Sequence, residues 1–188
     1  QALPLLLAVG VMAVHSAKAA ETTIGVAAAV KNDVRGTING ASSALAVGSN
    51  LFQGEVVQTG DASQTELLFN DQTNLSVGAK STVTLDKFIF DPNRGTGEVV
   101  LNASLGAFRF VTGSQDPKNY SIKTPTATIG VRGTINRFYI SPESLQVVHE
   151  EGETLIFLLD GTVVDLTERG SSFTLAADGT RTEQGAGG

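Results

Sequence analysis

Histidine is the side chain on which hydrolytic and metal chemistry most often depends, and this 188-residue chain has two. His15 lies in an apolar N-terminal segment, so His149, within Val-Val-His-Glu, is the one candidate for a general base. No Gly-x-Ser-x-Gly elbow accompanies it, and outside the N-terminal segment no second histidine or cysteine completes a zinc site. We therefore expect His149 to be a solvated strand residue beside carboxylates, and the protein not to be an enzyme.

The other motifs that hold cofactors are also missing from the sequence. It has no Gly-Lys dipeptide, which excludes a P-loop, and no EF-hand calcium loop. The absence of cysteine excludes disulfides and iron–sulfur clusters. We predict no cofactor and no metal site, and keep a hydrolase built on two carboxylates as a remote alternative.

The charges are unevenly distributed along the chain. There are 13 Lys and Arg against 19 Asp and Glu, and a chain this acidic does not bind a nucleic-acid backbone by bulk charge. Residues 21–140 are neutral, so the acidity belongs to residues 141–188, where Glu150, Glu151 and Glu153 concentrate it. These glutamates form either a solvated face that keeps the protein soluble or a surface for a basic partner or a loosely bound divalent cation.

Residues 3–14 are an apolar run that is too short for a transmembrane helix, which needs about 20 residues. The small residues Ala17 and Ala19 follow it in the spacing of a cleavage site. We predict that residues 1–20 are a signal peptide truncated at its start. The mature chain is then exported and has no integral membrane segment.

After residue 20 the sequence predicts an all-β fold. Short runs rich in Val, Ile, Thr and Phe alternate with turn residues, which is typical of stacked short antiparallel hairpins in a roll, solenoid-like or sandwich arrangement. Several predicted strands follow one another closely: 97–103 and 105–111, 127–131 and 134–140, 144–149 and 153–159. The run 155–159 has no polar alternation, so we expect it to be buried on both faces.

Three turns have a similar sequence, with Asp before a Thr that opens the next strand. They are Asn70-Asp71-Gln72-Thr73, Leu159-Asp160-Gly161-Thr162 and Ala177-Asp178-Gly179-Thr180. An Asp-Gly pair between apolar runs predicts a type I′ hairpin turn.

Four phenylalanines occur in two pairs, Phe88 with Phe90 and Phe108 with Phe110, and each pair lies on one strand face. They either fill the core or form an aromatic platform for sugar rings or bases. We favour the core, because phenylalanine has no polar handle and the chain has no Trp, the usual sugar-stacking residue.

One segment combines several residues with special backbone properties. Thr124-Pro125 predicts extended backbone at a strand start or edge, and Gly130 and Gly133 allow close backbone approach or a bulge. Arg132, between the two glycines, either clamps strands together through carbonyls or a carboxylate, or is presented to a partner's carboxylate or phosphate.

The apolar pattern also changes phase within this segment. Ile129 and Val131 share one face, whereas Phe138 and Ile140 have the opposite parity. A bulge near Arg132-Gly133 explains the change.

The segment 120–134, which contains Thr-Pro-Thr-Ala-Thr-Ile-Gly-Val-Arg-Gly-Thr, resembles the closing signature of the FecR-type periplasmic domain. Residues 53–63 resemble that family's opening segment, and residues 68–75 its Asp-Gly-Ser/Thr turn, with Gln72 at the usual Gly position. The resemblance covers about residues 45–140. Its motif residues here are Thr124, Pro125, Gly130, Arg132, Gly133 and Thr134, and it assigns none of them a catalytic role.

The resemblance implies a role in signalling. In the full-length regulators of this family, a cytoplasmic segment acts on a sigma factor, and the periplasmic part receives a signal from an outer-membrane receptor. Here a predicted signal peptide stands in place of the cytoplasmic segment, so the chain resembles a free-standing exported member without direct anti-sigma activity. We expect a FecR-like domain over 21–140 and an acidic β extension with a flexible tail over 141–188.

We therefore predict a non-enzymatic binding module for sensing, signalling or envelope organisation. It is expected in the periplasm, or secreted to the cell surface, of a Gram-negative-type bacterium. Its expected partner is an unidentified envelope protein or glycan. The alternative is a structural or adhesive surface domain of a longer chain.

Overall fold

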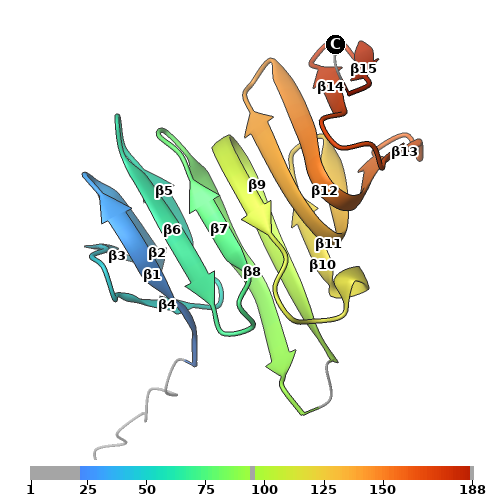
Figure 1. Cartoon of the computed structure of the whole chain (residues 1–188). Coiled ribbons are helices and arrows are strands. Elements are labelled where there is room, and N and C mark those ends of the chain that lie inside the picture. The colour runs from blue at the N-terminus through green and yellow to red at the C-terminus, as the bar shows by residue number, and fades with distance from the viewer. Residues whose placement is uncertain (1–21, 94–95, 187–188) are drawn as a thin grey trace, which may run out of the picture.

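A computed structural model describes residues 22–93 and 96–186, in which β-strands joined by turns and loops are the dominant secondary structure (Figure 1). The predicted signal peptide lies outside the described residues. One short 3-10 helix, η1 (Pro117–Asn119), precedes β10. The predicted all-β class is confirmed.

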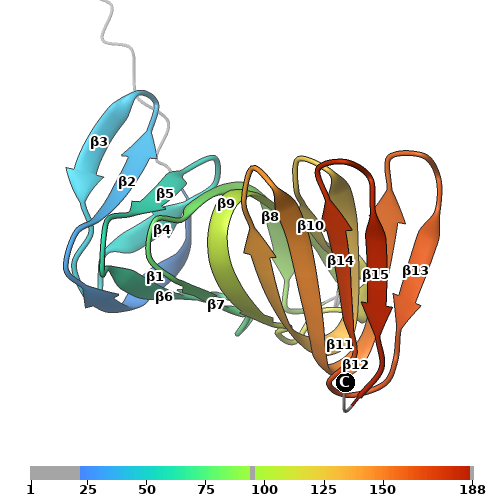
Figure 2. The ribbon, with the colours of Figure 1, turned by 90° about the horizontal axis from the view of Figure 1, so that it is seen from above.

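The strands form one continuous sheet that folds over into two facing layers. The first layer contains, in order, β4 (Asn50–Phe52), β1 (Thr23–Lys31), β6 (Gln64–Phe69), β7 (Asn74–Val77), β9 (Thr96–Val111), β11 (Ala127–Ile140), β12 (Ser144–Leu158), β14 (Ser172–Ala176) and β15 (Arg181–Gln184). The second contains β3 (Ala41–Ala44), β2 (Val34–Ile38), β5 (Val56–Thr59), β8 (Thr82–Asp91), β9, β10 (Tyr120–Lys123), β11, β12 and β13 (Val163–Leu166). Figure 2 shows β2 and β3 at one end of the stack and β13, β14 and β15 at the other.

The apolar core lies between the two layers. The rings of Phe69 and Phe88 stack across it with centroids 5.6 Å apart, and Phe110 meets Tyr120 edge to face at 5.9 Å. Phe108 and Phe110 are buried, and Phe88 packs against the core. The preference for core over an aromatic platform is confirmed for these three residues.

Three long strands belong to both layers, because each changes partners halfway along. The first half of β9 pairs with β8 and β10, and its second half pairs with β7 and β11. β11 and β12 likewise pair with each other through both layers. The three predicted pairs of separate strands were therefore wrong, since each pair is one bent strand. The turn-like residues between them mark bends rather than chain reversals.

β11 and β12 bend together. Gly133 (φ +57°) lies at the bend of β11, and Gly152 (φ +87°) lies at the bend of β12. The pairing register shifts between Arg132 and Ile135, so the predicted bulge is confirmed. A Cβ on Gly152 would collide with the carbonyl oxygen of Gly133, whereas a Cβ on Gly133 would meet no neighbour.

The three similar turns have one geometry, and it is not type I′. In the turn after β12, the Gly161 N–H donates to the Leu158 carbonyl (3.1 Å) and the Leu158 N–H to the Thr162 carbonyl (2.9 Å). Only Gly161 within this turn has positive φ, which defines a type I turn followed by a left-handed bulge residue. The same bonds recur in the other two turns, with Gln72 (φ +70°) or Gly179 at the left-handed position.

The paired bend predicts a large difference between two glycine substitutions. Gly161→Ala places a Cβ in open space and should cost about 1–2 kcal/mol of unfolding free energy, from the left-handed backbone alone. Gly152→Ala adds a collision with the β11 backbone and should cost at least about 3 kcal/mol, or prevent folding. Urea denaturation of both variants measures the difference, and equal costs would contradict the paired bend.

Candidate functional site

The FecR-like motif begins at the turn between β10 and β11. The Thr124 N–H donates to the Ala127 carbonyl (2.9 Å), and the Ala127 N–H donates back to the Thr124 hydroxyl (3.0 Å). Pro125 is exposed at the tip, where its missing N–H leaves no bond unmade. Thr124 and Pro125 therefore fix the hairpin that starts β11.

The next motif residues share the outer face of the second layer. Thr128, Gly130 and Arg132 alternate with buried residues along β11. A Cβ on Gly130 would lie 3.2 Å from Cε2 of Phe157, so the Phe157 ring leans over this glycine. Arg132 Nη1 lies 3.4 Å from Glu153 Oε2 on the paired strand, with both side chains partly exposed. Arg132 thus contacts a carboxylate and remains accessible.

The motif ends inside the protein. The bulge at Gly133 changes which alternate residues of β11 face the core, from odd-numbered positions before it to even-numbered positions after it. Thr134 is buried; its hydroxyl donates to the Glu151 carbonyl, and its N–H donates to the Thr112 hydroxyl (3.1 Å). The Thr112 N–H in turn donates a hydrogen bond to the Thr134 carbonyl (3.2 Å). Thr134 therefore ties β11 to the end of β9 and to the bend of β12.

A buried polar cluster lies beside this bend. The Thr154 hydroxyl donates to Asn136 Oδ1 (2.9 Å) and lies 2.9 Å from His149 Nδ1. The prediction that His149 is solvated was wrong: it is only 1% exposed, because it shares parity with the core residues Leu145 and Val147. Burial lowers the pKa of His149 below its ordinary value.

The predicted acidic surface contains arginines as well as glutamates. Glu150 lies between Arg109 (Nε to Oε2, 3.2 Å) and Arg137 (Nε to Oε1, 2.5 Å). Glu153 contacts Arg132, as described above. Glu151 is exposed, and its backbone carbonyl accepts the Thr134 bond. Two of the three predicted glutamates are thus partly neutralised by arginines from β9 and β11.

A second buried network, around Asp71, was not predicted. Asp71 Oδ2 accepts hydrogen bonds from the Tyr120 hydroxyl, Gln115 Nε2 and the Thr73 hydroxyl, each at 2.9 Å. Its Oδ1 accepts the Thr73 N–H (3.0 Å). The network fixes the β6–β7 turn to the segment before β10. The Asp-x-Thr turn was the available signal, although sequence alone did not distinguish this buried Asp from the exposed Asp160 and Asp178.

The expectation that residues 155–159 are buried on both faces was also wrong. Phe157 is 43% exposed and Leu159 83% exposed, and Val163, opposite Phe157 on β13, is 51% exposed. Among the residues that the structure describes, no layer covers this outer side of β12. The second layer therefore carries an exposed apolar patch close to Gly130 and Arg132.

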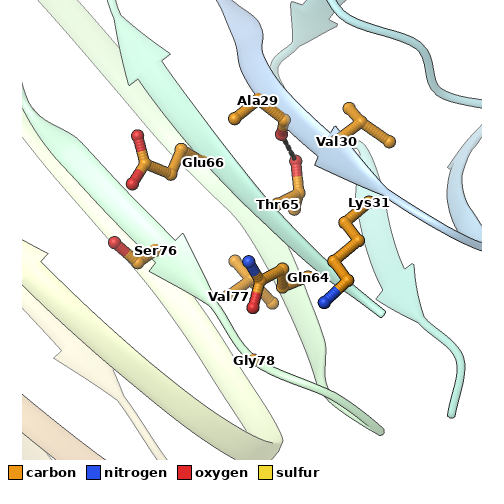
Figure 3. Close-up of a pocket in the computed structure, with 9 residues that line it drawn as sticks. All are labelled: Ala29, Val30, Lys31, Gln64, Thr65, Glu66, Ser76, Val77 and Gly78. Atoms are coloured by element: carbon orange, nitrogen blue, oxygen red, sulfur yellow. Dashed lines mark hydrogen bonds between the residues drawn. The ribbon is translucent and has the colours of Figure 1, made fainter. Parts of the chain in front are cut away.

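A hollow of about 280 Å³ lies at the other end of the molecule, over β1, β6 and β7 (Figure 3). Small residues such as Ala29, Ser76 and Gly78 line it, and Lys31 and Glu66 supply its charges. The Thr65 hydroxyl that lines it already donates to the Ala29 carbonyl (2.6 Å).

The described residues form neither a metal-binding cluster nor a membrane-spanning helix. Within residues 22–93 and 96–186, no group of three or more His, Cys, Asp or Glu side chains is arranged to hold a metal ion. In that same part of the chain, no helix is long and apolar enough to cross a bilayer.

These features define a two-layer β domain in which buried polar groups hold strands together. Part of the FecR-like motif lies on an exposed outer face of this domain. A family model described as "FecR protein" matches residues 55–164, and the chain belongs to the FecR family. No curated protein matches the chain at a significant level.

Two crystal structures of a candidate anti-sigma factor from Parabacteroides distasonis ATCC 8503 share the fold. They match with TM-scores of 0.57 and 0.56 at 12% sequence identity, and the match covers 70% of this chain. It covers 59% of that protein, so this chain corresponds to less than two thirds of its length.

Burial of neutral His149 predicts a pH-dependent stability. Because its pKa is lower in the folded chain than the ordinary 6.5, its stabilising contribution is complete above about pH 6.5 and falls as the pH decreases below that value. The unfolding free energy should decrease by at most about 1.4 kcal/mol per pH unit from this group. Urea denaturation between about pH 7.5 and 5.5 measures it. His149→Gln should show a weaker dependence, and an unchanged dependence would contradict the assignment.

Proposed function

We propose that the mature chain is an exported, non-enzymatic module of FecR type that acts in envelope signalling by binding another protein. The family match over residues 55–164 is the observation that carries this proposal. The predicted signal peptide supports a periplasmic or cell-surface location. The shared fold with a candidate anti-sigma factor supports a regulatory role.

The chemistry of the described residues supports binding rather than catalysis. The only histidine among them, His149, is buried and bonded within a structural cluster, where no substrate reaches it. Tyr120 is equally enclosed, and burial raises its pKa. Arg132 and Phe157, in contrast, are exposed on one face, and arginine and aromatic residues are the types that contribute most at protein interfaces.

In vivo photo-crosslinking tests the proposal. A photoreactive residue at Phe157 or Arg137, on the two opposite outer faces, is expected to give a discrete protein adduct from at least one position. Val47, 68% exposed in the loop before β4, is the matched control and should give none. Absence of protein adducts from both faces, with the protein folded and exported, would contradict the proposal.

Arg132→Ala distinguishes the two interpretations of the motif arginine. Because the Arg132–Glu153 pair is exposed, its loss should change the unfolding free energy by less than about 1 kcal/mol. If the Arg132→Ala variant folds but no longer gives the photo-crosslinked protein adduct, Arg132 is assigned to recognition of the partner. Unfolding would assign it to a clamp.

A further inference from the structure

β13 is the outermost strand of the second layer at the C-terminal end of the stack. Within the described residues it pairs only with β12, so one side of its backbone is open. A strand of this kind is a template for pairing with another chain. β13 consists of Val163, Val164, Asp165 and Leu166 and has no lysine, proline or bulge to discourage such pairing.

The neighbouring edge strand, β15, differs from β13 because charged side chains protect it from further pairing. Arg181 and Glu183 lie opposite Leu175 and the buried Phe173, so they are on the side of β15 that faces the other layer, although all four residues of β15 are exposed. Inward-pointing charges on an edge strand oppose the addition of a further strand. Arg181 also contacts Asp160 in the β12–β13 turn and donates to the Thr162 hydroxyl (3.2 Å), which joins the two layers at this end. Of these two edges, β13 is the open one.

The outer face beside β13 is apolar at one end. Val163 lies opposite Phe157, and Leu159 follows on the turn; all three are exposed. Side chains on an added strand would continue this row, since residues opposite one another on adjacent strands lie on the same face. The patch therefore favours an incoming segment with apolar residues at alternate positions.

The other end of β13 is acidic. Asp165, Glu168 and Glu183 line a hollow of about 270 Å³ between β13 and β15. Three of the six other carboxylates in residues 141–188 have arginine partners: Glu150, Glu153 and Asp160. Within the described residues, none of the three carboxylates in the hollow forms an ion pair. Their charge complements Lys or Arg on an incoming segment.

We propose that β13 binds an extended segment of a partner protein as an added strand, with apolar residues over Phe157 and Val163 and a basic residue at the Asp165 end. This inference rests on the proposed binding function and names its surface. The length of β13 fits a partner segment of about four to six residues, whose backbone bonds give affinity while these side chains give selectivity.

Selection from a displayed library of random ten-residue peptides, on the immobilised full chain, tests the proposal. We expect enrichment of peptides that alternate apolar residues and carry Lys or Arg near one end. Val163→Lys and Asp165→Lys should each weaken binding of a selected peptide at least about tenfold. Val47→Lys and Glu143→Lys, at exposed positions elsewhere, are the matched controls and should leave binding unchanged.

Three results would overturn the proposal. The first is that no peptide is enriched, and the second is that acidic peptides are enriched. The third is that the Val163→Lys and Asp165→Lys variants bind a selected peptide as tightly as the unsubstituted chain. A dimer in sedimentation that Val163→Lys abolishes would instead identify a second copy as the occupant. If crosslinks form from Arg137 while β13 binds no peptide, the proposed binding function stands and the assignment of β13 as the binding surface is wrong.

Discussion

Two paired strands can pass from one layer of a sandwich to the other only if both backbones bend at the same height. β11 and β12 do so at Gly133 and Gly152, which approach so closely that the second has no space for a Cβ. The register shift there reverses the parity of β11. As a result, both halves of the strand direct apolar side chains into one core, although the strand has changed layers.

This bend distributes the FecR-like motif between the surface and the interior. Before it, Thr128 and Arg132 face solvent; after it, Thr134 is buried and bonded to the bend of β12. Buried polar groups are costly unless they are hydrogen-bonded. The Thr154 cluster and the Asp71 network meet most of that requirement with bonds between separate strands, and within the described residues only Asn136 Nδ2 and Gln115 Oε1 are buried without a partner. The motif thus supplies exposed side chains on one side of the bend and a buried threonine that bonds neighbouring strands on the other.

The sequence was sufficient for the fold class, the Phe108 and Phe110 core positions and the bulge near Arg132, because these depend on local alternation of apolar residues. It was insufficient wherever the answer depended on which strands become neighbours. A phase break between residues 131 and 134 looks the same whether the chain reverses or bends. His149 was misassigned from its acidic neighbours, although its parity with Val147 indicated burial. Phe157 was misassigned because an apolar run does not reveal that, in the described part of the chain, nothing covers the outer side of β12.

The chain has no cysteine, so single-cysteine labelling can test the central claim that β11 reverses parity at Gly133. A thiol reagent applied to the native protein should modify cysteines at Thr128 and Arg132, then at Arg137 and Tyr139. Cysteines at Ile129, Val131, Asn136 and Phe138 should react only after unfolding, because these side chains are buried. Reactivity that keeps the same parity from residue 128 to residue 139 would contradict the account.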